Sequence, residues 1–270
     1  MKLLITLISV CLFYSPVQAQ TSLKKVITLQ LPEGDGSNAA AVVWHPVTQK
    51  YYTTIVGNAI YAMGIFDARG KVVEQNIEAE HDYRGMWYNP LKKRIEFNCY
   101  DSGGIGHLVL DKKGKITAKL IDLPGMNQPG DQSVGVYCAA GNKILYMNPQ
   151  THDVDQYDAV TGTSLGNFGT IYPGCKTKKE ADEMDVDAES AAWDSRNYTS
   201  VQYTGVPKAE LAILNVDDKQ VELYDRKTGL LTKKLKIPED VNLYPSFNFS
   251  YSNGIYWFFN KEDRKWVGCK

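Results

Sequence analysis

Residues 221–237, VELYDRKTGLLTKKLKI, contain the pattern that organises this chain. An apolar strand ends in aspartate, a short turn closes on glycine, and a second strand follows. An aspartate side chain can accept hydrogen bonds from the backbone of its own turn, and glycine adopts positive φ without a steric cost, so the pattern predicts a β-hairpin. The same plan recurs in YAMGIFDARGKVV (61–73), HLVLDKKGKIT (107–117) and VDQYDAVTGTSL (154–165).

A second series of strand pairs alternates with these hairpins. Trp44, Trp87 and Trp193 occupy similar places in the series, which favours a role in packing between strands. Trp44 and Trp87 are 43 residues apart, and Asp67 and Asp111 are 44 residues apart. Four strands within a period of this length are typical of a β-propeller blade. The second series comprises residues 39–55, 84–98, 134–148, 190–204 and 247–260.

We therefore predict an all-β chain with a single β-propeller domain over residues 20–270. Five blades are expected, with six as the alternative if residues 171–208 hold more than an insertion at 172–188. The N-terminal segment SLKKVITLQLP (22–32) is similar to the outer strand LLTKKLKIP (230–238), so it would complete the last blade and remove both exposed strand edges. The expected blades are 39–80, 82–123, 133–170, 188–237, and 245–270 together with 22–32.

Two of the turns also point to known repeats. YDAVTG (157–162) and YDRKTG (224–229) resemble the turns of YVTN, NHL and quinoprotein-like β-propeller repeats. The resemblance is at the level of the repeat and covers most of the chain after residue 19. It implies the propeller architecture and no particular activity, because such folds host both binding proteins and enzymes.

The N-terminus has the features of a secretory signal peptide over residues 1–19. Lys2 precedes an apolar run, and the small residues Val17 and Ala19 stand before the predicted cleavage point. The protein is therefore expected to be secreted or periplasmic. The run is too short for a membrane span, and no later stretch is long and apolar enough. After residue 19 the chain has 29 basic and 31 acidic residues. This balance does not provide the excess positive charge that favours binding to nucleic acid or to an anionic membrane.

Four cysteines follow the signal peptide: Cys99, Cys138, Cys175 and Cys269. An oxidising compartment permits disulfides, and four cysteines allow three pairings. Cys99 and Cys138 lie in strand-like apolar runs, where free buried thiols are an equal alternative.

The loops that lead into the inner strands of a propeller meet around one end of the central channel. Here they are residues 33–38, 80–85, 129–133, 185–190 and 239–246, and the loop 100–107 is expected on the same face. We expect this channel mouth to bind a small polar ligand or a protein partner, with Arg84 recognising a carboxylate or phosphate and Tyr83 or Tyr244 offering a stacking surface. The alternative is a purely structural role, in which these polar residues only cap turns. The candidate ligand-binding residues are His81, Asp82, Tyr83, Arg84, Asp101, His107, Asp131 and Asp240.

Binding without catalysis is the leading hypothesis, because no complete catalytic constellation is present. The alternative is a carbohydrate-active hydrolase, in which two carboxylates flank a glycosidic bond at roughly 5–10 Å from each other. The candidates for that role are Asp35, Asp82, Asp131 and Glu189.

The stretch DEMDVDAES (182–190) is the one candidate metal site. If it were an extended strand, Asp185, Asp187 and Glu189 would share one face and offer oxygen ligands to Ca²⁺. A solvated acidic insertion is the alternative, since the spacing of an EF-hand loop is absent. No other cofactor is expected.

Overall fold

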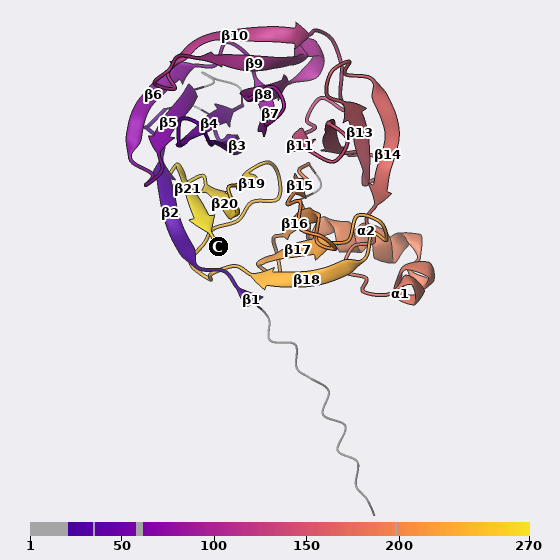
Figure 1. The fold of residues 1–270 in the computed structure, drawn as a ribbon. Helices are drawn as coiled ribbons and strands as arrows, with labels where there is room; N and C mark the ends of the chain where they lie inside the picture. The colour runs from indigo at the N-terminus through magenta and orange to yellow at the C-terminus, as the bar shows by residue number, and fades with distance from the viewer. Residues whose placement is uncertain (1–20, 35, 58–61, 198) are drawn as a thin grey trace, which may run out of the picture.

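The computed structural model describes residues 21–34, 36–57, 62–197 and 199–270. Five sheets stand around a central axis (Figure 1), which confirms the five-bladed propeller. The first blade consists of β3 (Asn38–His45), β4 (Lys50–Val56), β5 (Ala62–Asp67) and β6 (Val72–Glu78). The second consists of β7 (Tyr83–Asn89), β8 (Arg94–Cys99), β9 (Ile105–Leu110) and β10 (Ile116–Leu123). The third consists of β11 (Val136–Cys138), β12 (Lys143–Met147), β13 (Asp153–Asp158) and β14 (Ser164–Thr170).

The N-terminal segment closes the ring, as the sequence predicts. β2 (Lys25–Gln30) pairs antiparallel with β21 (Lys265–Cys269) and forms the outer strand of the fifth blade, with Leu29 opposite Trp266. β1 (Thr21–Ser22) adds a fifth, parallel strand to the fourth blade, so one segment ties both blades together. The last two blades consist of β15 (Gln202–Tyr203), β16 (Leu211–Asn215), β17 (Gln220–Tyr224) and β18 (Leu231–Lys236), and of β19 (Phe249–Ser252), β20 (Ile255–Asn260), β21 (Lys265–Cys269) and β2.

The repeated aspartates form the predicted turns. Asp67 Oδ1 accepts hydrogen bonds from the backbone N–H groups of Arg69 and Lys71 at 2.8 and 2.9 Å, and these bonds lower the pKa of its carboxyl group. Gly70 closes the turn with φ of +82°, and a Cβ there would lie 2.3 Å from the carbonyl oxygen of Thr28, so both conformation and space require glycine. Asp111, Asp158 and Asp225 likewise accept a hydrogen bond from the backbone N–H two positions further along the chain.

Apolar side chains fill the gaps between blades, and polar side chains join the inner strands. Between the first two blades, Tyr52 packs in one cluster with Tyr83 and Phe97. Asn248 Oδ1 accepts a hydrogen bond of 3.0 Å from the N–H of Ala39 in the neighbouring blade. An inner strand has no strand partner on its axial edge, so such side chains satisfy backbone groups that would otherwise be orphaned.

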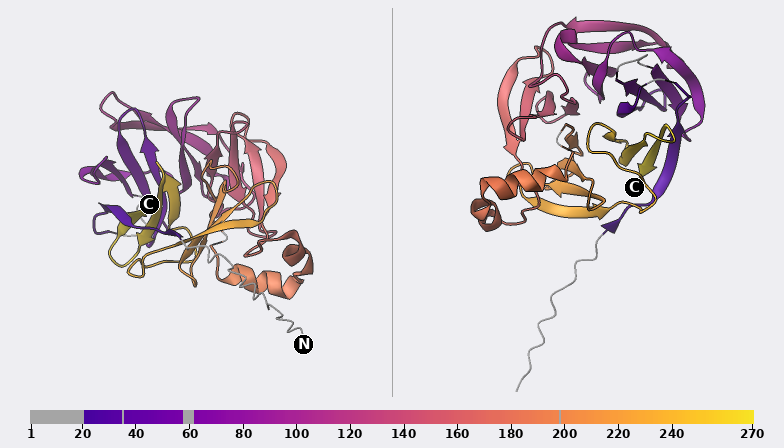
Figure 2. Two further views of the ribbon diagram at one scale, coloured as in Figure 1. Left: turned by 60° about the horizontal axis from the view of Figure 1, so that its bottom comes forward. Right: turned by 180° about the vertical axis from the view of Figure 1, so that it is seen from behind.

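Residues 178–194 differ from the prediction. They form two helices, α1 (Lys178–Glu183) and α2 (Val186–Asp194), which lie outside the ring next to the fourth blade (Figures 1 and 2). The predicted strand in 190–204 is therefore wrong over residues 190–194, and the strands of the fourth blade begin at β15 rather than near residue 188. The physical reason is local: Thr177 and Glu180 form a capping box for α1, and Asp185 caps α2, which is rich in alanine. Within the described residues, no helix is long and apolar enough to cross a membrane.

Trp193 is consequently not equivalent to Trp44 and Trp87. It lies on α2, is 2 % exposed, and packs its ring 4.7 Å from that of His152. Trp44 and Trp87 are not equivalent to each other either. Trp44 pairs with Tyr51 on β4, and the residue at the matching position of the second blade is Tyr88, which pairs with Ile95.

Candidate functional site

A cavity of about 790 Å³ opens at the end of the channel where the inner strands begin. All five blades contribute to its lining, so it sits on the propeller axis. We call it the upper mouth; its side chains include Asn38, Arg84, Asp131, Gln132, Gln150, Thr199 and Phe247.

Arg84 is the buried charge of the upper mouth. The residue is 5 % exposed, Nε donates a hydrogen bond of 2.9 Å to Gln132 Oε1, and Nη1 forms an ion pair with Asp82. The guanidinium carbon lies 4.5 Å from the ring centre of Tyr100 and 5.4 Å from that of Phe247. No described residue forms a hydrogen bond or ion pair with Nη2. A positively charged donor is therefore held rigidly at the cavity wall with hydrogen-bonding capacity left over.

The pKa of Asp82 is unusual for a carboxyl group beside an arginine. Burial raises its pKa, and the ion pair with Arg84 offsets that increase only in part, so the pKa stays above the ordinary value of 3.8. The group combines a shifted pKa with a place next to a concave site, which is a common property of functional carboxylates.

The geometry that brings Gln132 to Arg84 depends on two glycines. A Cβ on Gly85 would lie 2.5 Å from the carbonyl oxygen of Gly135, so the second and third blades approach each other there as only glycine permits. Asn98 spans the same contact: it accepts a hydrogen bond of 3.0 Å from Gly135 N–H and donates one of 2.9 Å to the carbonyl oxygen of Ser133.

The structure places only part of the predicted ligand set at the upper mouth. Arg84 and Asp131 line the cavity, and Asp82 contacts Arg84. His81 is half-buried with its ring 6.4 Å from that of Tyr83, and Asp101 is exposed on the short 3₁₀ helix η1 (Asp101–Gly103); neither lines the cavity. Asp35 lies outside the described residues.

Tyr83 does not offer a stacking surface. It is fully buried, its ring stacks on Phe97 at 4.0 Å, and its hydroxyl group donates a hydrogen bond of 2.8 Å to the carbonyl oxygen of Ala79. Side chains alternate along a strand, so placing Arg84 toward the upper mouth sends Tyr83 into the gap between blades. Tyr100 and Phe247 supply the aromatic contacts instead.

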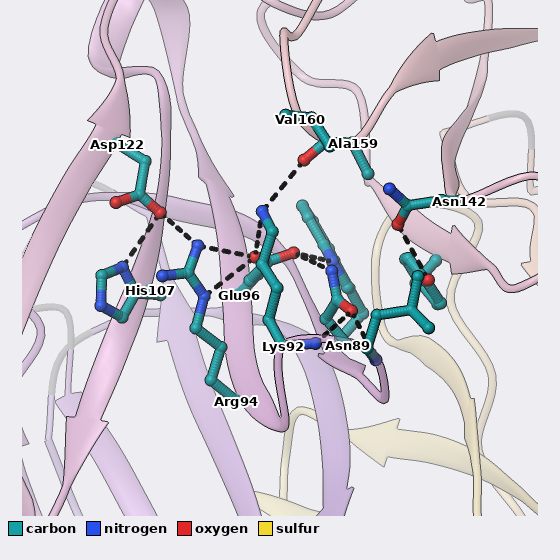
Figure 3. A network of polar contacts seen from close by, with 12 residues as sticks. Asn89, Lys92, Arg94, Glu96, His107, Asp122, Asn142, Ala159 and Val160 are labelled. Atoms are coloured by element: carbon teal, nitrogen blue, oxygen red, sulfur yellow. Dashed lines mark hydrogen bonds and ion pairs between the residues drawn. The ribbon is translucent and has the colours of Figure 1, made fainter.

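His107 belongs to a separate charged network, shown in Figure 3. Its Nδ1 lies 3.0 Å from Asp122 Oδ2, and Asp122 also pairs with Arg94, which in turn donates to Glu96 at 2.8 Å. None of these residues lines the upper mouth. The loop 100–107 was expected to carry His107 to the rim, but β9 begins at Ile105 and takes His107 down the blade.

Asp240 and Glu189 also lie away from the upper mouth. Asp240 is exposed and pairs with Lys25 on the outer strand β2. Glu189 is on α2, outside the ring. Of the four carboxylates considered for glycoside hydrolysis, Asp82 and Asp131 are the two that the structure places at this end of the channel.

The predicted one-sided arrangement of Asp185, Asp187 and Glu189 is wrong, because these residues belong to a helix. Asp185 is its N-cap and accepts a hydrogen bond of 2.8 Å from Ala188 N–H, while Asp187 and Glu189 stand two positions apart on α2 and face different directions. No cluster of three or more histidine, cysteine or acidic residues suited to a metal ion occurs in the described parts of the chain. The four cysteines are buried and unpaired, which favours the free-thiol alternative.

Comparison with known proteins supports the fold and does not identify an activity. No protein-family model and no curated protein sequence matches the chain. Among solved structures, the glutaminyl cyclase of Myxococcus xanthus is similar over 93 % of this chain and 97 % of its own, with a TM-score of 0.58 and 7 % identity. The β-propeller domain of Cps50 (Swd1) from Myceliophteria thermophila covers 88 % and 84 % at a TM-score of 0.47 and 10 % identity. At 7 % identity, the likeness to the glutaminyl cyclase shows a shared propeller fold alone.

Proposed function

We propose that this chain is a binding protein whose upper mouth takes a small polar ligand with a carboxylate or phosphate group on Arg84. The observation that carries the proposal is the state of that arginine: buried to 5 % exposure, oriented by Asp82 and Gln132, and lining a cavity of about 790 Å³ to which all five blades contribute.

The physical argument rests on preorganisation. A guanidinium group binds an oxyanion through a planar fork of donors, and it does so best when its rotamer is already fixed. Contacts with Gln132, Tyr100 and Phe247 hold Arg84 in this way. Gln132 accepts from Nε and Asp82 pairs with Nη1, so Nη2 is the donor that would meet the ligand. The side-chain amide of Gln150 also lines the cavity and suits a further polar atom of a small molecule, whereas the Thr199 hydroxyl group is already bonded to Asn197 and Phe247.

The test is calorimetric titration with succinate, citrate and inorganic phosphate, and with succinamide as the uncharged analogue. At least one anion should bind, and succinamide should not. Arg84→Ala should weaken that binding by about 1.5–3 kcal/mol, the range for a hydrogen bond to a charged group. Arg84→Lys should also bind poorly, because a lysine has no Nε and Nη1 donors for Gln132 and Asp82 and so cannot hold a further donor at the position of Nη2. Arg69→Ala, in an exposed turn, is the matched control and should change nothing.

Two results would contradict this assignment. The first is anion binding that is unchanged in a folded Arg84→Ala protein. The second is the absence of binding for every anion, which would leave a protein partner at the mouth as the alternative; a pull-down with wild-type and Arg84→Ala protein as baits would then compare the two.

A second candidate function, glycoside hydrolysis, is favoured by one observation: the raised pKa of Asp82, close to a cavity that Asp131 also lines. A carboxyl group with a raised pKa can serve as general acid toward a leaving oxygen. Turnover of aryl glycosides that is abolished by Asp82→Asn would support this function, and a protein inactive on a broad glycoside panel would exclude it.

We also propose that residues 1–19 direct export to the periplasm or the exterior. The support is their composition: Lys2, an apolar run and a small-residue cleavage pattern. N-terminal sequencing of protein expressed with these residues should begin at Gln20. A chain that retains Met1 in the cytoplasm would contradict the proposal.

A further inference from the structure

A second cavity, of about 280 Å³, lies at the opposite end of the channel, where the inner strands finish. We call it the lower mouth. Trp44 and Asn38 are six residues apart on β3, so at about 3.3 Å per residue the two mouths are separated by roughly 20 Å. All five blades line the lower mouth, as they do the upper one, but the chemistry differs.

Each inner strand contributes one half-buried aromatic residue to the lower mouth, at the equivalent position. These residues sit at matching points of the inner hairpins, opposite Tyr51, Ile95, Ile144, Leu211 and Tyr256 of the neighbouring strands. The five aromatic residues are Trp44, Tyr88, Tyr137, Tyr203 and Tyr251. Each packs at the border of a different hydrophobic cluster, so the five rings are distributed around the axis.

No charged side chain belongs to the lining of the lower mouth among the described residues. Its polar groups are neutral. Gln202 and Ser250 are occupied, because they hydrogen-bond the backbone at Phe249 and Val42. The indole N–H of Trp44 and the hydroxyl groups of Tyr88 and Tyr251, in contrast, form no hydrogen bond with any described residue. Three of the aromatic residues that line the cavity therefore carry a neutral donor that is unused within the described residues.

We propose that the lower mouth binds a neutral pyranose sugar ring. The aliphatic C–H faces of such a ring carry slight positive charge and fit against the negative faces of aromatic rings. Its hydroxyl groups provide both acceptors and donors for the unused groups of Trp44, Tyr88 and Tyr251. A quaternary ammonium ion would also suit aromatic faces, but it offers no acceptor to an indole N–H, and no carboxylate in the lining balances its charge. The volume fits a single ring rather than a chain.

This inference is independent of the upper mouth. Among the described residues, the lining of the lower mouth includes no carboxylate that could act as an acid or nucleophile, so the expected outcome is binding without cleavage. Arg84 does not line it, which makes Arg84→Ala a control that separates the two sites.

Intrinsic fluorescence provides the test, because Trp44 and Trp87 both line the cavity. Wild-type protein is titrated with methyl α-glucopyranoside, methyl β-galactopyranoside and N-acetylglucosamine, and with tetramethylammonium chloride as the cationic competitor. At least one sugar should give a saturable change, which Arg84→Ala leaves intact. Trp44→Ala should weaken it about tenfold or more, equivalent to about 1.4 kcal/mol. Tyr251→Phe, which keeps the ring and removes the hydroxyl group, should weaken it by roughly three- to tenfold.

Thermal melts establish whether each variant is folded. If Trp44→Ala is not folded, the test rests on Tyr251→Phe. The proposal is overturned if no sugar produces saturation at about 50 mM, far above a millimolar dissociation constant. It is equally overturned if tetramethylammonium saturates the signal while sugars do not, or if sugar binding is unchanged in both folded variants.

Discussion

Arg84 Nε and Gln132 Oε1 are joined by a hydrogen bond of 2.9 Å across the gap between the second and third blades. The two residues are 48 positions apart in the chain. Their contact makes the orientation of the arginine a property of the assembled ring and not of its own loop. Any change that moves these two blades relative to each other should therefore affect ligand binding at the upper mouth.

Gly85→Ala should destabilise the protein. The new methyl group would lie 2.5 Å from Gly135 O and 2.6 Å from Gly135 N, and backbone atoms cannot move aside as a flexible side chain can. A loss of about 1–3 kcal/mol in the free energy of unfolding is expected for such overpacking, and urea denaturation measures it. Gly130→Ala is the control at the same mouth, since the atoms nearest to its new methyl belong to side chains, Pro149 Cγ at 3.2 Å and Ser133 Oγ at 3.8 Å, and not to a backbone. Equal stability of the two variants would show that the blades can separate at Gly85.

The closing strand gives a second matched pair. Leu29 and Val26 both lie on β2, but Leu29 is completely buried while Val26 is 53 % exposed. Leu29→Ala should cost about 2–5 kcal/mol in the free energy of unfolding, because it leaves a cavity behind the outer strand. Val26→Ala should change that free energy by less than about 0.5 kcal/mol. Similar effects of both substitutions on denaturant midpoints would mean that β2 does not seal the ring in solution.

Glu96 makes stability depend on acidity. Burial alone raises its pKa, but hydrogen bonds from Asn89, Lys92 and Arg94 outweigh burial and lower the pKa below the ordinary 4.5. A carboxylate with a depressed folded pKa stabilises the native state above the unfolded value and loses that contribution as pH falls through the folded pKa. The stabilising effect of Glu96 should therefore be complete near neutral pH and decline below about pH 4.5.

Melting temperatures from pH 7 to 3 check this expectation. The gap between wild type and Glu96→Gln should narrow as the pH drops below the unfolded value. Glu183→Gln, on the exposed surface of α1, is the control and should follow the wild type throughout. A gap that is constant across the whole pH range would rule out titration of Glu96 as its source.

The four cysteine thiols should react only slowly with thiol reagents in the native protein. Burial raises the pKa of Cys99 to about 12 and that of Cys269 to about 11. At pH 8 only about one in ten thousand Cys99 side chains would be the reactive thiolate. A chromogenic thiol reagent should therefore give no rapid reaction with native mature protein and four equivalents in denaturant. Fewer than four after unfolding without reductant would indicate disulfides.

Much of the architecture could be read from local patterns. The aspartate–glycine turns at Asp67 and Asp225 predict hairpins because the turn chemistry involves residues only a few positions apart. The repeat period then gives the blade count, and the likeness between residues 22–32 and 230–238 gives the closing strand. Residues 186–194 are the exception: their alternating acidic residues favour a strand face, but Asp185 caps a helix that the alanine-rich run continues.

The binding surfaces could not be read in this way. Arg84 was placed at the upper mouth because it precedes an inner strand, yet its partners Gln132 and Phe247 come from other blades and carry no local mark. Tyr83, one position away, turned out to be core, since strand alternation gives adjacent residues opposite surroundings. Trp44, whose place in the repeat favours packing between strands, also lines the lower mouth. Periodicity specifies which residues form a blade, but a channel mouth exists only after five blades meet on one axis, and that meeting is set by packing between residues far apart in the chain.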